Sequence, residues 1–414
     1  MKYGRLKLSL FLNFALFSVL MSSDGILILQ VQKHYAVAPS VAGILGGCRD
    51  ISVAVAALLL AAYVARIGYK RSMMIALGIV TLICAIVPIG NSFSTIELLF
   101  VTTGAAFALI KSAIFSSIGL VAHDPRTHAS FMSYLEATYA FGTFTGYFVF
   151  SAYSGEEVAG STAWLQVYYL MAGASIFCMA FLGIAPIDES EVHEDRSEPL
   201  SADFIAMLKL AATAVAGAFA ACIFTYDFLA EGINKWLPTF NSDVLHIPVT
   251  LSIQLASITA ASAVIGRVLG GVAVRYFSWL TVLLTCLVLS ALLVLITLAL
   301  ATHVSAVAPT SWRTAPLTAY LFPLVGMVTA PIYPVINSLV LSSLPPRQHG
   351  AMSGLIMLCS ALGATVGSLI TGNIFQNYGG TTAFYWTLCP IFILALSLVL
   401  LNHFERKATA ALAA

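Results

Sequence analysis

Charged side chains are scarce in this sequence: Lys, Arg, Asp and Glu make up 9% of the 414 residues, and hydrophobic residues make up 60%. A soluble domain carries about 25% charged residues. A soluble chain with so few charges could not cover its apolar surface with polar groups. The net charge is +1, so the chain also lacks the basic surface that nucleic-acid binding requires. These absences indicate a protein of the lipid bilayer with no nucleic-acid partner.

Sequence signatures of enzymes, cofactors and disulfides are missing as well. No P-loop glycine–lysine pattern, H-E-x-x-H motif or G-x-S-x-G motif is present, which argues against ATP-driven transport and against hydrolysis. The seven cysteines lie inside apolar runs and form no C-x-x-C pair, so we expect small buried side chains and no disulfide. We therefore expect no enzyme activity, no metal and no cofactor.

Twelve apolar runs fill most of the chain, and about 20 apolar residues suffice for a helix to cross a bilayer. They lie at about 8–30, 41–65, 71–91, 96–121, 129–152, 163–185, 209–233, 249–274, 279–302, 315–343, 350–374 and 382–402. The predicted fold is an all-α membrane protein with twelve transmembrane helices in two pseudo-symmetric six-helix bundles. Residues 1–187 and 205–403 form the bundles, 188–204 form an acidic cytoplasmic linker, and 404–414 form a cytoplasmic tail.

Lys and Arg are distributed unequally among the predicted loops. With the N-terminus in the cytoplasm, thirteen lie on the inner side and three on the outer side, namely Lys33, Lys235 and Arg313. Cytoplasmic loops carry the excess of basic residues in membrane proteins. The pattern predicts a multi-pass protein of a cell membrane, such as a bacterial inner membrane, with both termini in the cytoplasm. We expect it to act as a monomer.

A short pattern occurs twice, 221 residues apart. Residues 125–128 read Pro-Arg-Thr-His before the fifth run, and residues 346–349 read Pro-Arg-Gln-His before the eleventh. Glycines follow each histidine at the same two distances, which pairs Gly142 with Gly363 and Gly146 with Gly367. The repeat indicates that the second half of the chain duplicates the first. Transporters with parallel repeats bind their substrate near the bilayer midplane.

Residues 61–71, after the second run, resemble the loop signature of the major facilitator superfamily. Arg66, Gly68, Lys70 and Arg71 match its basic and second glycine positions, whereas alanine replaces its first glycine and its aspartate. The resemblance implies the two-bundle fold, secondary transport by alternating access, and a gate charge at Arg66. Residues 226–238 are similar to the end of the seventh helix in the fucose–galactose–proton symporter group, which implies uptake coupled to protons.

Two charged residues lie in helices that line the central cavity in the resembled family. Asp24 is in the first span and Lys111 is in the fourth. A charge at membrane depth costs ~2.5 kcal/mol or more, so it needs a partner, a water-filled cavity or a function. One hypothesis is that Asp24 takes up the proton and Lys111 holds an anionic group of the substrate. The alternative is a buried ion pair that joins the two helices.

Further candidates lie on the seventh and tenth spans. Asp227 and Glu231 are four residues apart beside Tyr226, so the two carboxylates share one helix face. Two carboxylates this close repel when both are ionised, which suits a group that carries a proton. Alternatively, Glu231 is simply solvated at the membrane surface. Tyr333 and Asn337, also four residues apart, can offer hydrogen bonds to a polar solute.

Spans that flank the cavity in the resembled family hold three more charged residues. Arg49 and Asp50 lie in the second span and Glu136 lies in the fifth. Adjacent residues of a helix point about 100° apart, so Arg49 and Asp50 are expected to serve different partners, either to neutralise charge between helices or to act in a gate. Glu136 is a candidate for a gate or a proton relay. Arg267, in the eighth span, is expected to reach the cytoplasmic interface.

Three hypotheses for the function remain open at this point. The first is a secondary active transporter that imports a small polar or anionic organic solute together with protons. The second is a proton-driven exporter of an amphipathic compound or metabolite, which would also use membrane carboxylates. The third is a membrane receptor or assembly factor that has a transporter scaffold but does not transport.

Overall fold

The computed structural model describes residues 4–117, 125–154, 162–187, 214–302, 309, 311–343 and 349–413. Every regular element within these ranges is a helix, which confirms the all-α prediction. Eleven helical segments in the described ranges are long and apolar enough to cross a membrane. The predicted fifth span coincides with a further helix of 27 residues. The predicted acidic linker at 188–204 lies outside the described residues.

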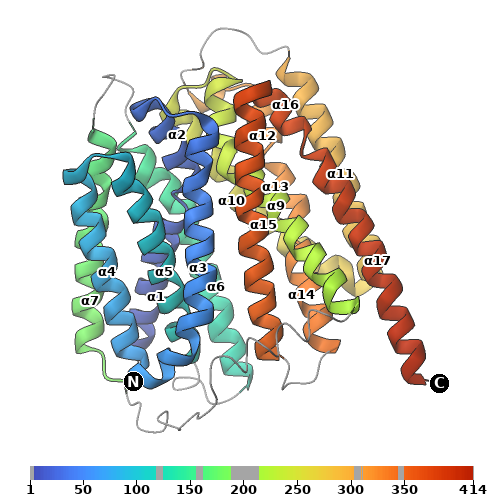
Figure 1. Ribbon diagram of the computed structural model, residues 1–414, viewed down its shortest axis with the longest axis horizontal. Coiled ribbons are helices and arrows are strands. Elements are labelled where there is room, and N and C mark those ends of the chain that lie inside the picture. Colours follow the sequence, from blue (N-terminus) through green and yellow to red (C-terminus); the bar gives the residue numbers. More distant parts are fainter. Residues whose placement is uncertain are drawn as a thin grey trace. The chain divides into compact units, whose positions relative to one another are not determined.

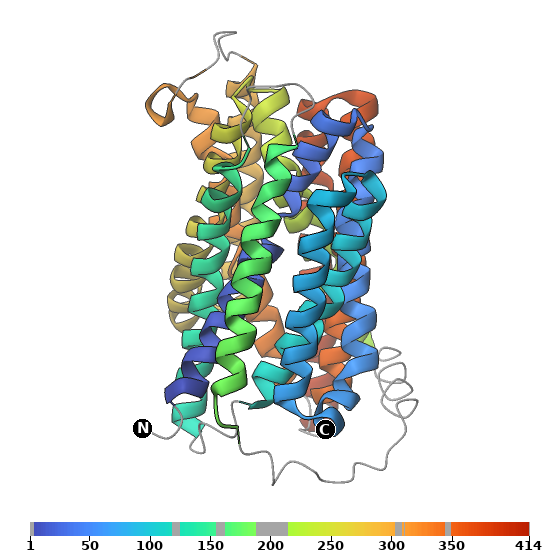
Figure 2. The ribbon, with the colours of Figure 1, turned by 90° about the vertical axis from the view of Figure 1, so that its left-hand side faces the viewer.

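The chain divides into two compact units (Figure 1): Met1–Val37 with Cys48–Glu198, and Ala38–Gly47 with Pro199–Ala414. The helices of the first unit are α1 (Gly4–Met21), α2 (Asp24–Tyr35), most of α3 (Pro39–Ile67), α4 (Tyr69–Gly90), α5 (Phe93–Ser117), α6 (Pro125–Ser151), the 3-10 helix η2 (Ala163–Gln166) and α7 (Val167–Ile184). Within this unit α4 packs against α5 and α7, and α1 packs against α6 (Figure 2).

The second unit repeats this pattern of long helices. Its helices are α9 (Ala214–Asp243), α10 (Val249–Tyr276), α11 (Trp279–Ala301), η3 (Trp312–Thr314), α12 (Leu317–Leu321), α13 (Leu324–Thr329), α14 (Ile332–Ser343), α15 (His349–Tyr378), α16 (Gly380–Tyr385) and α17 (Leu388–Ala413). Helix α9 packs chiefly against α15 and α17, and α10 packs against α13. The first turns of α3, residues 38–47, belong to this unit.

Several of the predicted spans are interrupted helices, and the first and the tenth are the ones that hold candidate site residues. The first span breaks at Ser22 and Ser23, between α1 and α2. Both hydroxyls donate to backbone carbonyls three residues back, at 2.7 and 2.6 Å, and such bonds compete with the helical pattern. The tenth span divides into α12, α13 and α14. Pro323 and Pro331 precede its last two segments, and proline cannot donate the backbone hydrogen bond that would continue a helix.

The repeated glycines of the first unit lie where α6 meets α1. A Cβ atom added to Gly142 would lie 3.0 Å from the carbonyl oxygen of Ala15, and one on Gly146 would lie 3.1 Å from that of Val19. Such distances are at the short limit of ordinary contacts. Because glycine has no side chain, the two backbones can approach this closely.

The repeated glycines of the second unit make the equivalent contact between α15 and α9. An added Cβ would lie 2.2 Å from the carbonyl oxygen of Phe224 at Gly363, and 2.3 Å from that of Phe228 at Gly367. Phe224 and Phe228 each follow their counterparts in α1, Ala15 and Val19, by 209 residues. The duplication therefore includes the helix that the glycines contact, and a residue of α1 corresponds to the residue 209 positions later in α9.

Replacement of Gly363 or Gly367 by alanine should destabilise the second unit, because the new methyl group would meet backbone that cannot move aside locally. Overpacking of this kind costs ~1–3 kcal/mol. Thermal unfolding of the purified protein in detergent measures the effect. The matched control is Gly271→Ala in α10, where no atom lies within 4 Å of the added Cβ. Equal unfolding temperatures for the two kinds of variant would contradict the close backbone contact.

Candidate functional site

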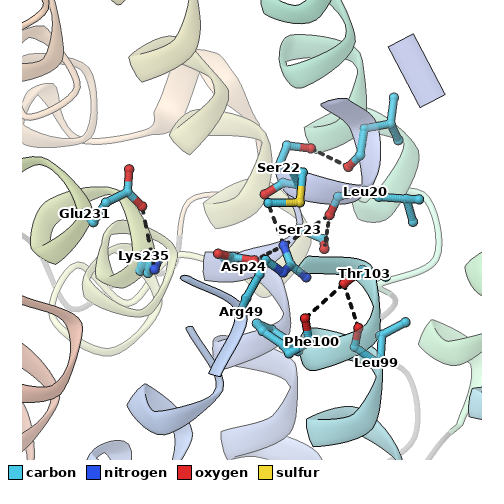
Figure 3. A network of polar contacts seen from close by, with 12 residues as sticks. Leu20, Ser22, Ser23, Asp24, Arg49, Leu99, Phe100, Thr103, Glu231 and Lys235 are labelled. Atoms are coloured by element: carbon cyan, nitrogen blue, oxygen red, sulfur yellow. Dashed lines mark hydrogen bonds and ion pairs between the residues drawn. The ribbon is translucent and has the colours of Figure 1, made fainter. Parts of the chain in front are cut away.

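The interruption of the first span is held by a buried ion pair (Figure 3). Asp24 begins α2 and Arg49 lies in α3, and their side chains form a salt bridge. The Arg49 guanidinium also donates to the carbonyl oxygens of Leu20 and Met21, both at 3.3 Å. These carbonyls lie at the end of α1, and that of Leu20 also accepts from the amide and the hydroxyl of Ser23. Arg49 therefore caps the end of α1, while the carboxylate of Asp24 stands at the start of α2, where the helix dipole favours negative charge.

Helix α5 encloses Arg49 from the other side. The guanidinium carbon lies 4.3 Å from the centre of the Phe100 ring, within the range of a cation–π interaction. Gly104 follows one turn later, and an added Cβ there would lie 2.7 Å from the Arg49 carbonyl oxygen. With 1% of its surface exposed, Arg49 is a structural centre of the first unit. Asp24 thus forms an ion pair with the second span, a partner that the sequence analysis did not name.

Lys111 lies in α5 among aromatic rings. Its side chain is half-buried, and Nζ lies 5.6 Å from the centre of the Phe107 ring and 5.4 Å from that of Phe115. Both distances allow cation–π attraction. The two rings stabilise the ammonium group by cation–π attraction. They offer it no hydrogen-bond acceptor, so its hydrogen bonds must be made with other groups.

These rings belong to a larger aromatic cluster, which the sequence did not predict. Phe14 lies 5.8 Å from Phe115 and 5.0 Å from Tyr139, and Phe107 lies 5.9 Å from Tyr139 and 6.3 Å from Phe17. The rings come from α1, α5 and α6. Aromatic pairs at such separations attract one another beyond their burial. Two rings of this cluster, Phe107 and Phe115, are those that contact Lys111.

The second unit brings Tyr226, Asp227 and Tyr333 together, as the sequence suggested. The ring centres of Tyr226 in α9 and Tyr333 in α14 are 5.7 Å apart. Asp227 accepts a hydrogen bond from the Ser360 hydroxyl of α15. Ser360 was absent from our predictions, because nothing in its local sequence distinguishes it from the other serines of the apolar spans.

Lys235 corrects our sequence interpretation, which placed it in an outer loop. Helix α9 continues past it to Asp243, and only 1% of Lys235 is exposed. Its Nζ lies 3.8 Å from a carboxylate oxygen of Glu231, one turn earlier in α9 (Figure 3). A Cβ added to Gly46 would lie 3.0 Å from the same Nζ. Glu231 is therefore part of an ion pair within the second unit, and two basic residues remain on the predicted outer side.

The remaining predicted residues differ in how far the structure describes them. Asn337, in α14, has a buried Oδ1 that finds no hydrogen-bond donor among the described residues. Asp50 is half-buried in α3, and Arg267 is exposed on α10. The side chains of Glu136 and Arg66 lie outside the part that the structure describes. No group of three or more His, Cys, Asp or Glu in that part could hold a metal ion.

Comparisons with known proteins agree on one family. The family model described as Major Facilitator Superfamily matches residues 8–367 and 281–413. Comparison with curated proteins finds no match.

Solved structures share the fold at low sequence identity. The nucleoside transporter NupG superimposes with a TM-score of 0.72 at 15% identity, over 96% of this chain and 98% of its own. A D-xylose–proton symporter gives 0.70 at 14% identity, over 97% of each chain. The transporter FucP in its outward conformation gives 0.62 at 14% identity, over 97% of this chain and 99% of its own.

Removal of one partner of the Asp24–Arg49 pair should destabilise the protein, because the other charge would stay buried without its counter-ion. Breaking a buried pair in this way costs ~3–5 kcal/mol. We expect Asp24→Asn and Arg49→Met each to lower the unfolding temperature, and the double variant to lose less than the sum of the two. Additive losses in this double-mutant cycle would contradict the pairing. Lys33→Met, at an exposed position near the end of α2, is the control.

Proposed function

The chain belongs to the major facilitator superfamily, and we propose that it imports a small polar or anionic organic solute together with protons. The fold and the family support secondary transport, in which a solute gradient or an ion gradient drives movement. They favour a transporter over an enzyme. Import, proton coupling and the solute class are our proposal, and proton-driven export of an amphipathic compound is the alternative. The partners in this proposal are the solute, protons and the lipid bilayer.

The position of Lys111 is the observation that supports an anionic group on the solute. An ammonium group in the middle of a long apolar helix is retained at a considerable cost. Phe107 and Phe115 orient it, as their ring centres lie 5.6 and 5.4 Å from Nζ. A cation held in this way is suited to bind a carboxylate or phosphate group of a solute.

Polar groups of the second unit support the proposal that the solute also carries hydroxyl or amide groups. The groups that we assign to solute binding besides Lys111 are Tyr226, Asp227, Glu231, Tyr333 and Asn337. A buried acceptor such as the Oδ1 of Asn337, which lacks a donor in the described part, gains from a hydrogen bond with a ligand. Two of the structural relatives are named for nucleoside transport and for D-xylose–proton symport, and both solutes are small and polar.

Membrane carboxylates are the groups on which proton coupling would depend. The candidates for this role that the sequence predicted are Asp24, Glu136 and Asp227. A carboxylate that takes up a proton from one side and releases it to the other links solute movement to the proton gradient. Arg49, Asp50 and Arg66 are assigned to charge neutralisation between helices or to a gate.

Uptake into right-side-out membrane vesicles tests the proposed direction and coupling. A thermal-shift screen against a metabolite library first supplies candidate solutes, because a bound ligand stabilises the folded state by mass action. We expect an inward proton gradient to drive accumulation of the solute, and a protonophore to abolish it. Exclusion of the solute under the same gradient would instead establish export.

Lys111→Ala should lower the affinity for an anionic solute at least tenfold while the protein still inserts and folds. One charge-assisted hydrogen bond is worth roughly 1.5–3 kcal/mol, which corresponds to a change of tenfold or more. Isothermal titration of the purified protein measures the affinity. Lys33→Ala, outside the aromatic cluster, should leave it unchanged. Wild-type affinity in Lys111→Ala would remove Lys111 from the binding site.

A further inference from the structure

The two units build the same helix pair with different polar residues. The glycine contacts fix the correspondence at 209 residues between α1 and α9, and at 221 residues between α6 and α15. The corresponding pairs at the site are Phe17 with Tyr226, Ser18 with Asp227, Ser22 with Glu231, and Tyr139 with Ser360. Serine in the first unit is therefore replaced by a carboxylate twice in the second.

An independent contact supports this correspondence. Phe17 of α1 stacks against Phe107 of α5, with ring centres 6.3 Å apart. Tyr226 of α9 contacts Tyr333 of α14, with ring centres 5.7 Å apart. In both units an aromatic ring of the first span thus meets one of the fourth, and the following residue is Ser18 in one unit and Asp227 in the other.

The carboxylates are not needed to pack these helices. In the first unit the hydroxyls of Ser18 and Ser22 donate to carbonyl oxygens of their own helix, at 2.8 and 2.7 Å. They hold no neighbouring helix in place through these bonds. The backbone approach in the second unit is at least as close, with acidic residues at the same positions. The glycines therefore account for the close approach of the backbones, and the polar contacts of α9 are made in addition to it, by Asp227 with Ser360 and by Glu231 with Lys235.

We propose that Asp227 is the carboxylate that carries the coupled proton, and that Ser360 is its positioning residue. This inference rests on the proposed function. The Ser360 hydroxyl donates to Oδ2 of Asp227, which stabilises the ionised carboxylate. A hydroxyl can also accept, so a protonated Asp227 can donate to the same Ser360 oxygen. The hydrogen bond survives in both states with its direction reversed, and the proton passes to Asp227 from one side of the membrane and from it to the other.

Two other described carboxylates of the spans face basic side chains. Asp24 pairs with the buried Arg49, and protonation of Asp24 would leave that guanidinium without its counter-ion. Glu231 lies 3.8 Å from the buried Lys235, and protonation of Glu231 would weaken that pair. Since an uncompensated buried charge is costly, both pairs resist the repeated protonation that transport demands.

Groups from three other helices interact with Asp227 or with its neighbour Tyr226. Cys359 and Ser360 of α15 lie near Asp227, and Arg267 of α10 and Tyr333 of α14 interact with Tyr226, as does Glu231 of α9. The charges of Glu231 and Arg267 have opposite signs. Ser360 is the neighbour whose removal changes the hydrogen bond to Asp227 without changing any charge.

Asp227→Ser, which installs the residue of the first unit, tests the main claim. We expect the variant to fold with the unfolding temperature of the wild type. With the solute at a saturating concentration, so that a change in affinity has no effect, accumulation driven by a proton gradient should fall at least tenfold. Gradient-driven accumulation at the wild-type level would overturn the proposal. A loss of folded protein would contradict the argument that α9 packs without the carboxylate.

Ser360→Ala tests the positioning role separately. Loss of a hydrogen bond to the ionised carboxylate favours its protonated form, so the pH at which exchange is half-maximal should rise by about one unit. The maximal exchange rate should stay within about twofold of the wild-type rate. Ser397→Ala, where the hydroxyl bonds only within α17 at 2.9 Å, is the control and should not shift the profile. An unshifted profile in Ser360→Ala would remove Ser360 from this role.

Measurements on the wild type and on Asp227→Ser distinguish a failure of proton-coupled import from a failure of the Asp227 assignment. If the wild-type protein accumulates no solute in response to a proton gradient, then proton-coupled import itself is wrong. If the wild type accumulates solute and Asp227→Ser does so equally, only the assignment of the proton to Asp227 is wrong.

Discussion

The contact of backbone against backbone between two helices of each unit determines where the site residues lie. Gly142 and Gly146 allow α6 to approach α1, and Gly363 with Gly367 allows α15 to approach α9. Such contacts fix the rotation of each helix about its axis, because a turned helix would place a side chain where only a glycine fits. Once the rotation is fixed, the residues on the neighbouring face are fixed as well. An aromatic ring then faces the fourth span in both units.

The two units differ in how their charges are used. In the first unit the span is interrupted at Ser22 and Ser23, and the carbonyls of Leu20 and Met21 at the end of α1 accept hydrogen bonds from Arg49. Arg49 is in turn neutralised by Asp24. Helix α9 is continuous through the corresponding positions, so no capping charge is needed there. The difference in helix continuity explains why Asp24 has a structural role in its unit. Asp227, which accepts a hydrogen bond from a hydroxyl, does not have to neutralise a capping charge.

Length, hydropathy and the repeated glycines were sufficient to predict the fold. Apolar runs of bilayer length predict spans with little ambiguity, and the described helices correspond to the predicted runs. The sequence also brought forward Tyr226, Asp227 and Tyr333 because polar groups stand out within apolar helices. It could not predict the partners. The Asp24–Arg49 pair joins consecutive spans, while the Asp227–Ser360 bond and the aromatic cluster join spans far apart in the chain. All of them depend on the rotation of each helix about its axis, which the hydropathy pattern does not show. Lys235 was misplaced because α9 extends beyond the hydropathy limit of its run.

The glycine contacts also explain how one unit can change its chemistry without losing its fold. The attraction between α1 and α6, or between α9 and α15, comes from close packing of backbone and small residues, a source of stability that suits a lipid environment because apolar side chains gain nothing by leaving lipid. In the first unit Ser18 itself packs against Gly142, whereas at Gly363 and Gly367 the atoms nearest to an added Cβ belong to the backbone of α9, so the close approach there does not depend on the side chain at position 227. A serine can therefore be exchanged for an aspartate there at small cost, provided that a hydroxyl such as that of Ser360 is within reach. Stability and chemistry in these helices are thus carried by different residues, and a duplicated scaffold can be acidic in one half and neutral in the other.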